Sequence, residues 1–206
     1  MINNDLLYYI PSGEFGKEGV LGLLKTHPEI RFVSLVGIDL AGNDTDEKVP
    51  IELFLKNYDD FFAGTAVQTD GSSVVLMNIA TLNDARVDMV ADASVNWYVD
   101  YNEDNLYSNG RPVGTLRIPC FLLHKGKFID SRSSLKESCA FVAEKLKGLL
   151  ASGKPVKGME DLPVDEIEDI KFTIGTELEF WVKTPSETET VQHLSISQRL
   201  QEQYWQ

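Results

Sequence analysis

The apolar residues of this chain come in short runs that turn residues close, and this punctuation constrains the fold more than any other feature. Phe32–Ile38 and Glu47–Ile51 are separated by Ala41–Asp44, which is rich in turn formers, so they predict a β-hairpin. The polar stretch Asn102–Gly114 is predicted to be an irregular excursion. Later apolar runs of strand length predict further strands at Val74–Ala80, Val87–Val90, Val95–Val99, Leu116–Leu123 and Phe128–Asp130.

Helical spacing of apolar residues occurs in three places. Glu52–Ala63 has it and stops at Gly64, and Gly16–Thr26 predicts a shorter helix. A third helix is predicted to begin at Ser134, because Ser134 and Glu137 have the spacing of a capping box, and to run to Leu150. Several strands crossed by one helix within about a hundred residues predict an α+β fold, a small mixed sheet packed on that helix.

The last part of the chain is harder to assign to packed structure. Ser152–Asp169 carries prolines, glycines and acidic residues and is predicted to be a linker. Ile170–Val182 alternates well enough to predict a strand or a pair of strands. Ser195–Gln206 resembles a helix that is cut off, with apolar residues ready to be buried, so we expect the chain to end before its active site is complete.

Composition narrows the class of protein. The chain has 206 residues, of which 43% are hydrophobic and 25% charged, as in an ordinary soluble protein of one to two domains. It has no apolar run of membrane-spanning length and no leader pattern, so a cytoplasmic location is expected. A formal net charge of -13 disfavours nucleic acid and membrane partners. Cys120 and Cys139 are predicted to be buried thiols rather than a disulfide framework.

Two carboxylates in the last predicted strand could hold a metal. Glu177 and Glu179 are two residues apart, so a strand would place both side chains on one face. Adjacent anions repel unless a cation lies between them, and Mg²⁺ and Mn²⁺ prefer oxygen ligands of this kind. A solvated strand face is the commoner explanation of such a pair taken alone.

A polar turn is the second candidate site. Asp70–Ser73 reads Asp-Gly-Ser-Ser and offers a carboxylate and hydroxyls that could hold a small polar or cationic ligand, although the same residues make ordinary turns. The three histidines are scattered and do not predict a metal cluster. Neither a phosphate-binding loop nor a dinucleotide-binding glycine motif is present.

Four motifs, in this order, resemble the glutamine synthetase family from about Arg31 to Trp205. They are Asp70–Ser73, Val87–Met89, Asp130–Ser133 and Gly175–Phe180, which are similar to the family's Asp-Gly-Ser-Ser, Ser-Asp-Met, Asp-Pro-Arg-Ser and Gly-Pro-Glu-x-Glu-Phe. Departures include Thr176 for proline, Val87 for serine and a segment after Met89 that is about two residues shorter, which suggests a divergent branch.

The resemblance implies an appendage over residues 1–27, a β-grasp domain over 28–130 and the beginning of a truncated α/β catalytic domain over 131–206. It implies ATP-dependent ligation of ammonia to glutamate through a γ-glutamyl phosphate, giving glutamine. Glu177 and Glu179 match metal ligands for Mg²⁺ or Mn²⁺, and Asp70, with Ser73 beside it, matches the aspartate that binds ammonium and takes its proton.

The family's architecture implies a ring-shaped homo-oligomer in which the Asp-Gly-Ser-Ser loop reaches a neighbouring subunit. The family's remaining metal ligands, glutamate-binding arginines and nucleotide site correspond to positions beyond Gln206, so the chain alone is expected to be inactive. Two alternatives stay open: a related ligase that joins glutamate to another amine, and a non-catalytic module for subunit assembly.

Overall fold

The computed structural model describes residues 4–14, 16–153, 157–158, 167–177 and 179. The chain divides into two compact units, Met1–Ile167 and Glu168–Gln206, which are considered separately. The helices and strands of the described residues belong to the first unit.

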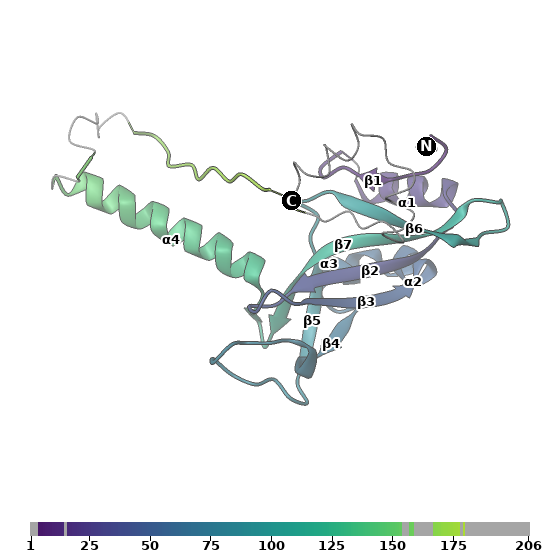
Figure 1. Ribbon diagram of the computed structural model, residues 1–206, viewed down its shortest axis with the longest axis horizontal. Helices are drawn as coiled ribbons and strands as arrows, with labels where there is room; N and C mark the ends of the chain where they lie inside the picture. Colours follow the sequence, from purple (N-terminus) through teal and green to yellow (C-terminus); the bar gives the residue numbers. More distant parts are fainter. Residues whose placement is uncertain (1–3, 15, 154–156, 159–166, 178, 180–206) are drawn as a thin grey trace, which may run out of the picture. The chain divides into compact units, whose positions relative to one another are not determined.

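The sheet is built around one long strand, β7 (Pro112–His124) (Figure 1). It pairs in parallel with β2 (Ile30–Ile38) and antiparallel with β6 (Trp97–Leu106), β5 (Arg86–Ala91) and β8 (Lys127–Phe128). The parallel pair makes the sheet mixed.

Shorter strands complete the edges. β3 (Asp44–Pro50) pairs with β2 to form the predicted hairpin, β1 (Tyr9–Ile10) pairs with β6, and β4 (Gln68–Asp70) pairs with β5. The strand order is β1-β6-β7-β2-β3, with β5 on β7 and β4 on β5. The α+β fold class predicted from the sequence, a β-grasp-like mixed sheet packed on a helix, is confirmed.

Helices account for the remaining regular structure. The first is α1 (Lys17–Thr26), close to its predicted bounds. The predicted helix Glu52–Ala63 is instead two helices, α2 (Ile51–Lys56) and α3 (Tyr58–Ala63), because Asn57 between them leaves the helical conformation with φ -116° and ψ 34°. The stop at Gly64 is confirmed, since this residue has a left-handed φ of 72° that glycine adopts without strain.

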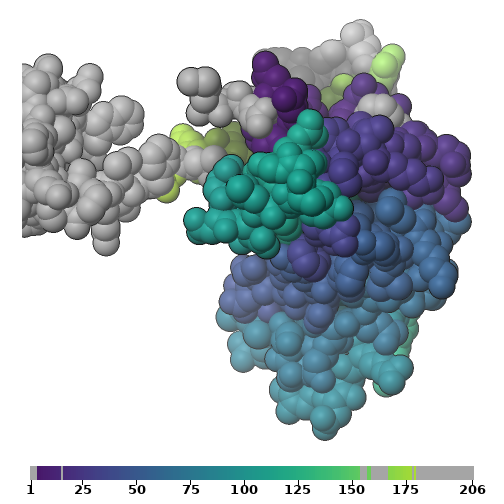
Figure 2. All heavy atoms as spheres, turned by 90° about the vertical axis from the view of Figure 1, so that its right-hand side faces the viewer, coloured from purple at the N-terminus to yellow at the C-terminus, as the bar shows by residue number. Residues whose placement is uncertain are grey.

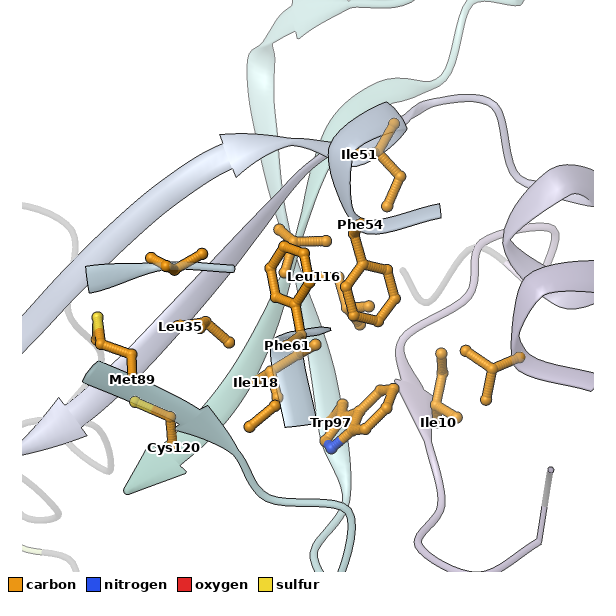
Figure 3. Packing of buried hydrophobic residues seen from close by; sticks show 14 of the residues in the cluster. Ile10, Leu35, Ile51, Phe54, Phe61, Met89, Trp97, Leu116, Ile118 and Cys120 are labelled. Carbon is orange, nitrogen blue, oxygen red and sulfur yellow. The ribbon is translucent and has the colours of Figure 1, made fainter. Parts of the chain in front are cut away.

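The hydrophobic core lies between the sheet and these helices. Figure 3 shows Phe54 and Phe61 from α2 and α3 packed over the sheet residues, with Trp97 close by. The Phe54 ring is edge-on to Phe61 at 5.0 Å and to Trp97 at 6.2 Å between centroids. The sheet contributes side chains with 0% exposure, namely Val33, Leu35, Val87, Met89, Leu116, Ile118, Cys120 and Leu122.

The predicted strand Val74–Ala80 is wrong. Asp70 is followed by a single 3₁₀ turn, η1 (Gly71–Ser73), and then by a loop in which Leu76 and Ala80 form an isolated bridge. Asn78 has a positive φ of 57°, which reverses the chain within the bridge. The apolar residues of this loop do not form a strand face. Leu76 is buried and anchors the loop, whereas its neighbour Met77 is exposed.

The predicted polar excursion Asn102–Gly114 is also wrong in its first and last parts. β6 continues to Leu106 and β7 begins at Pro112, so the polar residues belong to a hairpin. In Figure 2 the tip of this hairpin, in teal, lies beside the purple N-terminal segment. The sequence pattern missed the hairpin because residues 102–105 of β6 are exposed and polar.

A buried carboxylate holds the hairpin tip. The Glu29 side chain is 0% exposed and accepts hydrogen bonds from Asn109 Nδ2 at 3.1 Å and Arg111 Nη1 at 3.3 Å, and it lies 2.9 Å from His27 Nδ1. Burial pushes the pKa of Glu29 upward, but hydrogen bonds from His27, its own backbone and Asn109 outweigh it and hold this pKa below 4.5.

The helix α4 (Ser131–Ala151) begins three residues before its predicted start. Its N-cap is Asp130, not Ser134, because the Asp130 carboxylate accepts the backbone N–H of Ser133 at 2.7 Å. The same carboxylate accepts the N–H of Leu122 at 3.0 Å, which fixes the helix start to β7. The predicted capping box therefore gave the right helix with the wrong cap.

The second unit carries no strand among the residues described. Residues 170–177 and 179 are irregular, so this part of the predicted strand Ile170–Val182 is wrong, and its remaining positions lie outside the described residues. The predicted helix Ser195–Gln206 also lies outside them. Within the described part of the chain, the longest helices are too polar or too short to cross a bilayer.

Replacing Phe61 by alanine should lower the free energy of unfolding by about 3–5 kcal/mol, because it leaves a cavity at a fully buried site. Phe141→Ala is the matched control, since Phe141 is 62% exposed on α4 and should change stability by less than about 1 kcal/mol. Urea unfolding followed by circular dichroism measures both. Equal losses for the two variants would contradict this core.

Glu29 should make stability depend on pH. Its folded pKa lies below the ordinary 4.5, so its contribution is present above that pH and is lost as the pH falls through the folded value. Glu29→Gln should cost about 1–3 kcal/mol at pH 7 and flatten the loss of stability below pH ~5. The exposed Glu103→Gln is the control. Parallel stability curves for Glu29→Gln and wild type between pH 7 and 3 would refute this role.

Candidate functional site

The Asp70–Ser73 turn lies where β4 ends. Asp70 is the N-cap of η1, and its Oδ1 accepts the backbone N–H of Ser72 at 2.7 Å. Asp70 and Ser73 are both exposed, and Thr69 before them is buried. The turn therefore presents its carboxylate and hydroxyl to solvent from a fixed strand end.

Gly71 explains why the turn has this sequence. It is buried, and a Cβ at this position would lie 2.1 Å from the carbonyl oxygen of Leu82. Its N–H donates to the carbonyl of Ala85 at 2.7 Å, so the segment before β5 closes directly over it. A side chain here would force that backbone away.

A buried aspartate that the sequence did not reveal braces the loop after the turn. Asp39 is 0% exposed and accepts the backbone N–H groups of Ala41 at 2.8 Å, Asn43 at 2.9 Å and Val75 at 2.8 Å. Burial raises the pKa of Asp39, but the bonds from Val75 and Asn43 outweigh it and lower the pKa overall. The turn-rich sequence after Asp39 indicated the local bonds, whereas nothing in it pointed to a partner 36 residues away.

The electrostatics of Asp70 favour its charged form. Hydrogen bonds from the Ser72 side chain and backbone lower the pKa of Asp70 below 3.8. In the β4–β5 ladder Asp70 is the register partner of Arg86, and Gln68 is the partner of Asp88, so these four side chains share one face. Asp70 can therefore accept hydrogen bonds from a cation or a polar donor at neutral pH.

An open hollow of about 720 Å³ lies beside this face, and we call it the β4–β5 hollow. Figure 1 shows the loop between the two strands extending away from the rest of the sheet. The lining comprises Gln68, residues 81–86, Asp88, His124 and Lys125.

The other two motifs of the first unit, Val87–Met89 and Asp130–Ser133, make structural contacts. In β5, Val87 and Met89 point into the core while Asp88 points outward. At the start of α4, Arg132 Nη2 donates to Asp92 at 2.5 Å and its guanidinium lies 4.9 Å from the centre of the Phe121 ring. These contacts fasten the helix to the sheet.

Glu177 and Glu179 are exposed residues of the second unit. Their shared strand face is not formed, because the described residues around them are irregular. Two carboxylates suit a hard divalent ion, which takes about six oxygen ligands, but the described residues include no group of three or more His, Cys, Asp or Glu side chains placed to hold a metal. Two carboxylates alone are fewer ligands than such an ion takes.

Of the comparisons with known proteins, the one with solved structures gives a match. Neither a protein-family model nor a curated protein matches the chain. Among solved structures the chain is similar to a glutamine synthetase of Plasmodium falciparum studied by cryo-electron microscopy, with a TM-score of 0.45 and 18% sequence identity. The match covers 65% of this chain and 24% of that one, so the chain spans about a quarter of that protein's length.

Gly71→Ala should destabilise the fold by about 1–3 kcal/mol and displace the Asp70–Ser73 turn, because the added methyl group meets the Leu82 carbonyl. The control is Gly22→Ala in α1, where a Cβ has no heavy atom within 4 Å and should leave stability unchanged or raise it by up to about 1 kcal/mol. Urea unfolding and backbone amide chemical shifts report both effects. Unchanged shifts at Asp70–Ser73 in Gly71→Ala would disprove the packing argument.

Proposed function

We propose that this chain is the amino-terminal portion of a glutamine synthetase-type ligase, which joins ammonia to glutamate at the expense of ATP through a γ-glutamyl phosphate. The observation that carries the proposal is the Asp70–Ser73 turn, an exposed carboxylate and hydroxyl on a buried glycine support. The order of the four sequence motifs supports it too. Residues 28–130 would be the β-grasp domain and 131–206 the start of the catalytic domain.

Asp70 would act on ammonium. Its lowered pKa makes it a weak base but a permanent negative charge at neutral pH, which suits holding a cation. Ammonium bound at this carboxylate would have the proton to be lost within reach of a carboxylate oxygen. Ser73, the last residue of the turn, would add a hydroxyl to the same polar surface.

Solvent exposure of the turn fits a role in trans. The carboxylate does not point into a closed cavity of its own unit, so a second copy in a ring-shaped homo-oligomer could receive it. A rigid backbone is needed for such a role, and Gly71 and Asp39 provide it through contacts with Ala85 and Val75.

Glu177 and Glu179 would hold Mg²⁺ or Mn²⁺ together with ligands from other residues. The ion, when bound, screens phosphate charge during phosphoryl transfer from ATP. The contribution of this chain is two exposed carboxylates that are separated by one residue. A cytoplasmic location belongs to the same proposal.

The test uses the whole protein of which this chain is proposed to be the amino-terminal portion. With glutamate, ATP, Mg²⁺ and ammonia it should form glutamine, and Asp70→Asn should lower kcat about 10²–10⁴-fold, because the neutral amide neither holds ammonium by charge nor takes its proton. Asp84→Asn is the matched control, an exposed aspartate near the same loop that should leave kcat unchanged.

Two results would contradict the proposal. One is the absence of glutamine together with no ATP consumption, which would favour an assembly module. The other is full activity of Asp70→Asn. Product formed with other amines but not with ammonia would replace glutamine synthesis by a related glutamate–amine ligation.

A further inference from the structure

Arg86 stands apart from the other arginines. Five arginines lie among the described residues, and four of them, Arg31, Arg111, Arg117 and Arg132, form ion pairs with Asp or Glu. Arg86 forms none with the residues that the structure describes, although the chain carries 32 acidic residues against 19 basic ones.

The geometry of the Asp70 turn accounts for the free guanidinium. Asp70 is the register partner of Arg86 and is therefore a candidate for an ion pair with it. The Asp70 carboxylate instead accepts the backbone N–H of Ser72 at 2.7 Å and caps η1. Arg86 is thereby left exposed on the wall of the β4–β5 hollow.

Two more basic side chains line the same hollow. His124 Nδ1 lies 3.0 Å from the Arg86 carbonyl oxygen, which places the ring beside Arg86. Lys125 follows in the β7–β8 turn, where its φ of 49° directs the chain back, and it too forms no ion pair among the described residues. Because β5 and β7 are paired strands, Arg86 and His124 lie on neighbouring strands, and Lys125 directly follows His124.

The carboxylates of the hollow limit what could bind there. Asp88 Oδ1 accepts a hydrogen bond from Gln68 Nε2 at 2.5 Å, and Asp84 is exposed at the rim. With these two charges and a net charge of -13, a polyanion such as nucleic acid is repelled. One small oxyanion near Arg86 and Lys125 is still attracted.

We propose that the β4–β5 hollow binds the phosphate group of a small molecule, with the Arg86 guanidinium as its principal ligand and Lys125 and His124 beside it. Guanidinium presents parallel N–H donors that match two phosphate oxygens, and lysine adds a point charge. Gln68 and Asn83 supply neutral polar groups for the rest of the molecule. The site does not depend on Asp70 being catalytic.

The experiment titrates inorganic phosphate into the full 206-residue chain at pH 7 and constant ionic strength, with binding followed by backbone amide chemical shifts. Wild type should show saturable shifts at residues 81–88 and 124–125. Arg86→Gln should weaken binding at least about tenfold, the loss expected for a hydrogen bond to a charged group. Lys125→Asn should weaken it as well, and asparagine tolerates the positive φ at this position.

Lys127→Gln is the matched control, because Lys127 is an exposed lysine two residues from Lys125 that does not line the hollow. It should bind phosphate as wild type does. The proposal is overturned by non-saturable shifts in wild type, by equal losses in Lys127→Gln and Arg86→Gln, or by tighter binding of acetate than of phosphate. If Arg86→Gln fails to fold by circular dichroism, the result for Lys125→Asn decides in the same way.

Discussion

Pairing to β7 is the constraint on which the rest of this structure depends. Its first part, through Pro119, lies between β2 and β6, while Cys120–Leu123 pair with β5. Its inward residues Leu116, Ile118, Cys120 and Leu122 are all 0% exposed, so the strand is also the floor of the core. Because β4 reaches the sheet through β5, the Asp70 turn and the β4–β5 hollow both depend on the second part of β7.

Local pattern predicted those elements whose burial repeats with a regular period. The hairpin β2–β3, the strand β5 and the helix α1 follow from alternation or helical spacing, since their side chains pack against one continuous core. Prediction failed where a distant group decides the conformation. Val74–Ala80 has the composition of a strand, but the Asp39 carboxylate takes the N–H of Val75 and Asn78 reverses the chain, so no ladder forms. At the polar end of β6 the error is the opposite one, a strand that was not predicted. Pairing with β7 forms this strand without apolar side chains.

In the candidate site, too, features made by local contacts could be predicted and features made by distant contacts could not. The Asp70–Ser73 turn could be predicted because its residues make their own local bonds, and Gly71 signals a close approach of backbone. Asp39 could not be recognised as its brace, since the contact joins positions 36 residues apart. The hollow could not be predicted either, because its basic residues come from β5, from the end of β7 and from the turn after β7. Glu177 and Glu179 remain a prediction from motif order, without a strand to place them together.

Four carboxylates of this acidic chain have a structural use. Glu29, Asp39, Asp92 and Asp130 are buried, and each gathers several donors to hold a loop or a helix start. A carboxylate that takes backbone N–H groups no longer needs a cation, which is how Asp70 and Arg86 can face each other across two strands without forming an ion pair. Both groups then stay open to solvent, one as an anion and one as a cation. The ladder therefore holds an exposed anion and an exposed cation on neighbouring strands, although the two are register partners.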